Sequence, residues 1–231
     1  VLEYKARLGL HRARTVDLNA VMAHVGTRQG AELARTTAER AITLLRDDRT
    51  AVPLQTPRGG RVLYLSVLDY PSGWRIAAPA RTFIPELRAR WANVTAIELS
   101  DRSSAEELDL VRTMAGSYDA VVLGVFVRAS SGSGRLDLGP GVVRLLQDLS
   151  AAAGRRQQPL VSVFFGSPYA AVAASALPSV LLTYDFGDYA EAAAVRALAG
   201  EIAIQGRLPV ALGEGLPVGF GVARPGPAAG R

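Results

Sequence analysis

Polar and charged side chains that could do chemistry follow several apolar runs of the sequence. Asp69, Asp185 and Asp188 are carboxylates that could act as general acid and base or hold the hydroxyl groups of a sugar. The same residues also have a structural interpretation, in which Asp188 caps a helix and the other two aspartates cap loops. The sequence alone leaves both interpretations open.

Two further groups could contact a ligand. Trp74 beside Arg75 offers a stacking face and a cation, although a tryptophan packed beneath a loop would have the same sequence. The Ser-Ser-Gly-Ser-Gly stretch that starts at residue 130 could bring backbone N–H groups close to an anion. It matches neither the G-x-G-x-x-G nor the P-loop pattern, so an ordinary surface loop is the alternative. The candidate binding residues are Asp69, Trp74, Arg75, Arg128, Ser131 and Arg135.

Composition excludes several kinds of site. The 231 residues contain no cysteine and only two histidines, His11 and His24, which excludes thiol nucleophiles, disulfides and the common zinc sites. Both histidines precede the apolar runs, which argues against a Ser-His-Asp triad. Lys5 is the single lysine, so a P-loop lysine is excluded. We therefore predict no cofactor, no metal and no self-contained catalytic residues.

Charge and hydropathy limit the partners. The 26 basic and 21 acidic residues give a net charge of +5, but the arginines are spread along the chain. A nucleic-acid-binding surface is typically a basic stripe with interleaved aromatic residues, so we expect no nucleic-acid partner. No apolar run approaches the roughly 18 residues that span a bilayer, and we expect no membrane span. With 49% apolar residues, the chain should be a well-buried globular domain.

The elements that position the candidate residues follow from the apolar pattern. Short runs rich in β-branched residues predict strands buried on both faces, and helical patterns lie between them. Ser104 and Glu107 have capping-box spacing, as do Asp188 and Glu191. This regular alternation predicts an α/β fold: a doubly wound, mainly parallel sheet of five to six strands with helices on both faces. The predicted strands are 61–68, 94–99, 118–127, 160–165 and 180–184.

The predicted fold suggests where a ligand would bind and how the chain is organised. Ligands of doubly wound sheets bind beyond the carboxyl ends of the strands, where the candidate binding residues lie. We expect a linker, or the tail of a preceding domain, at 1–26 and the α/β domain at 27–213. Within that domain, 27–41 predicts a helix that leads into an edge strand or hairpin. The Gly-, Pro- and Ala-rich residues 214–231 should form a loose tail.

Several segments also occur in an informative order: VLEYKARLGL, AERAITLLRDDRTAVPL, GWRIAAPARTFIPELR, RLDLGPGVVRLL and GRLPVAL. Together they resemble the second domain of glycoside hydrolase family 3 enzymes, closest to the β-N-acetylglucosaminidase type. VLEYKARLGL is similar to the helix that leaves the N-terminal barrel of that family. The resemblance implies an αβα domain, a (β/α)8 barrel on the same polypeptide, a carbohydrate substrate and a periplasmic or secreted location.

The resemblance places the catalytic residues elsewhere. In that family the nucleophile is an aspartate of the barrel, and the acetylglucosaminidases take their acid/base from a barrel loop; neither motif occurs here. Some β-glucosidases of the family recruit a glutamate from the second domain, but residues 128–141 contain none. We therefore predict a domain that stabilises a barrel, lines the sugar site and, in isolation, self-associates. The alternative is a stand-alone domain that binds a small polar or anionic ligand at the strand ends.

Overall fold

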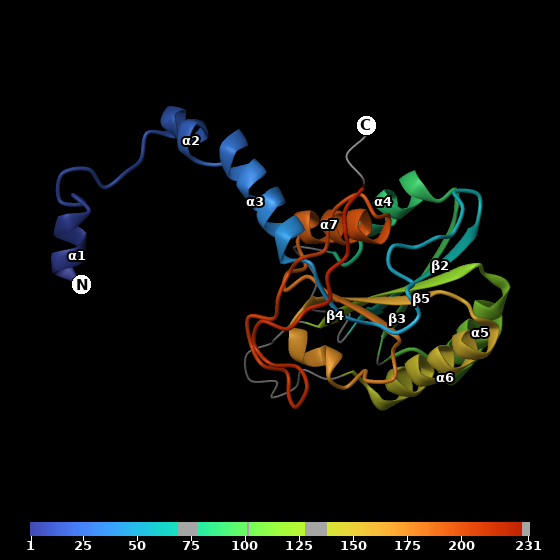
Figure 1. Ribbon diagram of the computed structural model, residues 1–231. Helices are drawn as coiled ribbons and strands as arrows, with labels where there is room; N and C mark the ends of the chain where they lie inside the picture. The colour runs from blue at the N-terminus through green and yellow to red at the C-terminus, as the bar shows by residue number, and fades with distance from the viewer. Residues whose placement is uncertain (69–77, 101, 128–137, 228–231) are drawn as a thin grey trace. The chain divides into compact units, whose positions relative to one another are not determined.

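The computed structural model describes residues 1–68, 78–100, 102–127 and 138–227 (Figure 1). It divides the chain into two units, Val1–Thr36 and Thr37–Arg231. The first unit holds α1 (Leu2–Arg7), α2 (Leu18–His24) and the first part of α3 (Arg28–Ala41). No residue of these three helices is buried, so the first unit has no hydrophobic core of its own.

The second unit is built around one six-stranded sheet. The strand order is β1-β6-β5-β4-β2-β3, in which only the β1–β6 pair is antiparallel. This arrangement confirms the predicted mainly parallel sheet, with the two most apolar runs, β4 and β5, inside it. The strands are β1 (Thr43–Asp47), β2 (Arg61–Leu68), β3 (Asn93–Ser100), β4 (Ala120–Val127), β5 (Leu160–Gly166) and β6 (Ser179–Leu182).

Helices cover both faces of the sheet, as predicted (Figure 1). Side chains of β2 alternate between the faces: Tyr64 belongs to one core cluster with Phe83 and Leu87 of α4, whereas Leu65 belongs to the other with Leu145 of α6. Helices α4 and α7 therefore share one face, and α5 and α6 share the other. The four helices are α4 (Phe83–Arg90), α5 (Ala105–Met114), α6 (Pro140–Arg156) and α7 (Asp188–Leu198).

One of the two predicted capping boxes is present. The Ser104 hydroxyl accepts a hydrogen bond from the Glu107 N–H at 3.2 Å, and the Glu107 carboxylate accepts one from the Ser104 N–H at 2.7 Å. The predicted box of Asp188 and Glu191 is wrong, because the N-cap of α7 is Gly187 and both carboxylates bind the start of α4 instead. After β5 the chain forms a short 3-10 helix, Pro168–Ala171, where the pattern between two strands predicted a helix.

The described part of the predicted C-terminal tail is bound to the sheet rather than loose. The Val222 N–H donates to the carbonyl of Leu44 in β1 at 2.8 Å, and Arg224 forms an ion pair with the buried Asp47 at 2.6 Å. The chain also approaches the start of β1 closely at position 206. A glycine is required there, because a Cβ would collide with the carbonyl of Ile42. Residues 204–224 thus cover the outer edge of β1, which would otherwise be open to pairing with another strand.

Several buried side-chain atoms have no hydrogen-bond partner among the described residues, including the hydroxyls of Tyr64, Ser66 and Ser162. Tyr64 is fully buried, and its hydroxyl has no hydrogen-bond partner among the described residues. The ring lies 5.0 Å from that of Phe83 and over Gly124, where any Cβ would collide with the phenol. Burial raises the pKa of Tyr64, so the hydroxyl stays neutral.

This geometry predicts the effect of removing the hydroxyl. Tyr64→Phe keeps the ring contacts and removes an unpaired buried polar group, whose desolvation costs about 1 to 3 kcal/mol. We expect the free energy of unfolding in urea to be unchanged or to rise by about 1 kcal/mol. A loss of about 1 kcal/mol in the variant would contradict this interpretation, because it would mean that the hydroxyl has a partner in solution.

Candidate functional site

The sheet order locates the edge where a ligand would bind. Strand β2 lies between β3 and β4, so the chain reverses its winding direction at the β2–β4 pair. In doubly wound sheets, ligands bind beyond the carboxyl ends of the strands at such a reversal. Leu68, the last residue of β2, is in register with Phe126 near the end of β4. The segments 69–77 and 128–137 therefore begin at neighbouring strand ends.

The six candidate binding residues all lie in these two segments. Asp69, Trp74, Arg75, Arg128, Ser131 and Arg135 are outside the described residues, so the structure does not test them. The parallel pairing of β2 with β4 brings only the starting points of the two segments together.

A buried carboxylate binds the backbone of the described residues that follow the first segment. Glu191, in the first turn of α7, is 1% exposed. Its Oε1 accepts a hydrogen bond from the Ala80 N–H at 2.8 Å, and its Oε2 accepts from Thr82 and Phe83 at 2.7 and 2.8 Å. Thr82 is the N-cap of α4 but makes no side-chain cap of its own, so Glu191 pairs N–H groups that the helix cannot satisfy.

Asp188 strengthens the same junction from the surface. Its carboxylate accepts two hydrogen bonds from the Arg81 guanidinium, at 2.6 and 2.5 Å, and one from the Thr82 hydroxyl at 2.9 Å. The hydrogen bond with Arg81 lowers the pKa of Asp188. Asp185 accepts a hydrogen bond from the N–H of Phe186, its own neighbour. These contacts give both aspartates a structural role, but the expectation that Asp188 caps its own helix is wrong, because the N-cap of α7 is Gly187.

Glu191 is unsuited to catalysis in spite of its chemistry. Burial raises the pKa of its carboxyl above the ordinary value, and the three N–H groups oppose that effect. Both oxygens are already occupied by the backbone, and the side chain cannot reach a ligand in solvent. Glu191 therefore has a structural role: it anchors the start of α4. Its spacing from Asp188 was visible in the sequence, but its partners lie more than 100 residues away.

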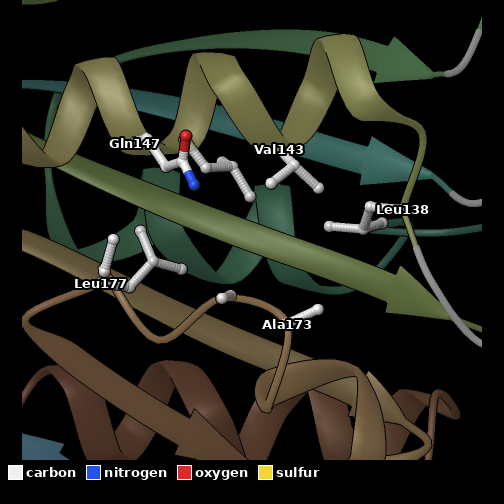
Figure 2. Close-up of a pocket in the computed structure, with 8 residues that line it drawn as sticks. Leu138, Val143, Gln147, Ala173 and Leu177 are labelled. Carbon is white, nitrogen blue, oxygen red and sulfur yellow. The ribbon is translucent and has the colours of Figure 1, made fainter.

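A small apolar crevice opens beside α6 (Figure 2). It lies between that helix and residues 173–177, and its cavity volume of about 10 Å³ has room for little more than one water molecule. The Gln147 amide is the single polar side chain among its lining residues, so the crevice offers no acid, base or cation. Its lining residues are Leu138, Val143, Leu146, Gln147, Ala173, Ala174, Ala176 and Leu177.

Neither a metal site nor a membrane-spanning helix is found in the part of the chain that the structure describes. No group of three or more His, Asp or Glu side chains there is placed to hold a metal ion. Nor does any helix among the described residues have the length and apolar character needed to cross a bilayer.

The fold resembles part of several longer solved proteins. No protein-family profile and no curated protein matches the sequence. A fungal multi-domain GH3 β-N-acetylglucosaminidase superposes with a TM-score of 0.67 at 22% identity, over 90% of this chain and 21% of that one. A glycoside hydrolase family 3 β-N-acetylglucosaminidase from Paenibacillus sp. gives 0.66 at 21% identity, over 91% of this chain and 38% of that one.

A β-glucosidase from Listeria innocua gives a TM-score of 0.72 at 17% identity, over 96% of this chain and 37% of that one. The chain thus spans between about a fifth and two fifths of the length of these proteins. Because the identities are low, the comparison concerns the fold. At that level it confirms the resemblance to the α/β domain of family 3 enzymes that the sequence segments indicated.

Proposed function

We propose that this chain is the C-terminal α/β domain of a family 3 glycoside hydrolase that releases terminal β-linked N-acetylglucosamine. The observation that carries the proposal is the match of about nine tenths of the chain to a minor part of longer glycosidases. The acetylglucosaminidases match at 21 and 22% identity and the β-glucosidase at 17 to 19%. The support for the acetylglucosaminidase type comes from the ordered sequence segments, which are most similar to that type.

The proposed partner is a (β/α)8 barrel of the same polypeptide. The first unit supports this, because Leu2, Leu18 and Met22 are 82, 78 and 80% exposed although they are large and apolar. A segment without a core that exposes such side chains is typical of a surface covered in the complete protein. The barrel would cover it, and the sheet unit would stabilise the barrel in return.

The catalytic carboxylates of the enzyme would lie on the barrel. Glycoside hydrolysis needs two carboxyl groups that flank the scissile bond. Among the described acidic residues, Asp188 and Glu191 are held by Arg81 and by the start of α4. The α/β domain would then position the barrel and line one side of the sugar site.

This assignment predicts an inactive isolated chain. The 231-residue protein should not hydrolyse 4-nitrophenyl N-acetyl-β-D-glucosaminide or the matching glucoside, measured by release of nitrophenol. The protein extended by its upstream coding sequence should hydrolyse the first substrate with a kcat/KM at least about tenfold higher than the second, a difference of about 1.4 kcal/mol.

Each alternative outcome has a distinct meaning. Turnover by the isolated chain that survives re-purification would contradict the placement of the catalytic residues on a barrel. An upstream reading frame without a barrel would favour the stand-alone binding domain. A preference of the extended protein for the glucoside would overturn the acetylglucosaminidase type but keep the glycosidase domain.

We also propose that the segment after β2 contacts the sugar through Asp69, Trp74 and Arg75. In the extended enzyme, changing each of them to alanine should lower kcat/KM and leave the melting temperature unchanged. The fall in kcat/KM should correspond to a loss of about 1 to 3 kcal/mol of transition-state stabilisation. If these residues only support their own loop, the melting temperature would fall and the kinetics would stay the same. Measuring both quantities for the three variants distinguishes the two interpretations.

A further inference from the structure

Five charged side chains form a continuous network on the α4/α7 side of the sheet. Arg90, at the end of α4, donates two hydrogen bonds to the Glu201 carboxylate, at 2.6 and 2.7 Å. The same guanidinium donates to the Glu86 carboxylate at 2.6 Å. The Arg90 side chain is only 18% exposed, so solvent screens these contacts less than those of an ordinary surface pair.

Arg196 of α7 extends the network to α3. Its Nε lies 3.6 Å from Glu201, and its Nη1 donates to the carboxylate of Glu39. Glu39 belongs to residues 37–41, the last turn of α3, which we call the foot of α3. The foot is part of the second unit, and the side chain of Glu39 is 18% exposed. One guanidinium therefore joins the foot to both α7 and, through Glu201, α4.

Apolar packing of the foot is weak by comparison. No residue of α3 is buried, and Ala38 packs against the α4/α7 core only as a partly buried side chain. The first fully buried residue of the chain is Ile42, directly after the helix. An alanine methyl contributes little apolar area. The ion pair with Arg196 therefore provides much of the contact between the foot and the rest of the second unit, which we call the sheet domain.

We propose that the network is an ionic latch: its ion pairs, rather than apolar burial, hold the foot of α3 on α7. The proposal does not depend on the glycosidase assignment, because every residue of the latch lies in the sheet domain. The latch matters because α3 is the helix through which the chain passes from the first unit into the second. Loss of the Glu39–Arg196 pair should free the foot while the sheet stays folded.

Hydrogen–deuterium exchange on the 231-residue protein tests the latch. Arg196→Met removes the charge and keeps most of the apolar stem, and it should speed the exchange of amides 37–41 at least about tenfold. Amides of β5 should exchange as in the wild type, which shows that the sheet stays folded. Arg112→Met, which removes a guanidinium of similar exposure that pairs with Asp109 and Asp148 on the α5/α6 side of the sheet, is the matched control and should leave the foot protected.

Salt and a second variant complete the test. In 1 M NaCl the wild-type foot should exchange faster than at low salt, because the Debye length falls to about 3 Å, whereas exchange in Arg196→Met should not respond to salt. Glu39→Gln should reproduce the effect of Arg196→Met. The latch is overturned if the foot stays protected in either variant, or if salt accelerates its exchange equally in the wild type and in Arg196→Met.

Discussion

Replacing Val122 by aspartate is expected to unfold the sheet domain. Val122 is fully buried in β4, in register with Tyr64 of β2 on one side and Val161 of β5 on the other. The change removes about 1.5 to 3 kcal/mol of apolar burial, and an uncompensated buried charge costs about 3 to 5 kcal/mol more. Together these losses reach the lower part of the total stability of a typical domain, which is about 5 to 15 kcal/mol.

Circular dichroism melting curves and urea titrations measure this effect. Val163→Asp, in the neighbouring strand β5, should behave in the same way, because Val163 is also fully buried. Thr95→Asp is the control: Thr95 is half-buried on the edge strand β3, so its variant should keep a cooperative transition. If either valine variant melts like the wild type, these runs are not central core strands.

Glu191→Ala should cause the second-largest loss. Three backbone N–H groups at the start of α4 lose their common acceptor, and a buried unsatisfied donor costs about 1 to 3 kcal/mol. Because water can enter the space that the side chain leaves, we expect about 3 kcal/mol in total and a melting temperature lower by roughly 10 °C. The loss should be measured by urea titration and by a thermal melt.

Two comparison variants isolate the cause. Glu191→Gln keeps one acceptor oxygen and should lose roughly half as much as the alanine variant. Glu107→Ala removes the exposed carboxylate of the α5 capping box and should cost only about 1 kcal/mol. Equal losses for Glu107→Ala and Glu191→Ala would mean that the buried carboxylate is an ordinary helix cap and not the main anchor of α4.

Features that depend on nearby residues could be predicted from the sequence. The strands of the sheet are continuous apolar runs, and side chains must alternate between two covered faces, so the pattern of 61–68 and 118–127 already implies a buried parallel sheet. The Ser104–Glu107 capping box joins residues three positions apart, so its spacing was sufficient to identify it. The absence of cysteine and the position of both histidines also followed from the sequence directly.

Tertiary structure alone decided where the acidic residues after β6 point. Asp188 and Glu191 have the spacing of a capping box, yet the start of α4 offers N–H groups without a cap of its own, and both carboxylates bind there. Residues 214–231 have the composition of a loose tail, but Val222 pairs with β1 and Gly221 lies close enough to Gly206 that a Cβ there would collide with its carbonyl. In both cases the deciding partner lies far away along the chain. Local patterns determine which elements form, whereas the binding of an unsatisfied backbone group to a distant side chain depends on how those elements pack.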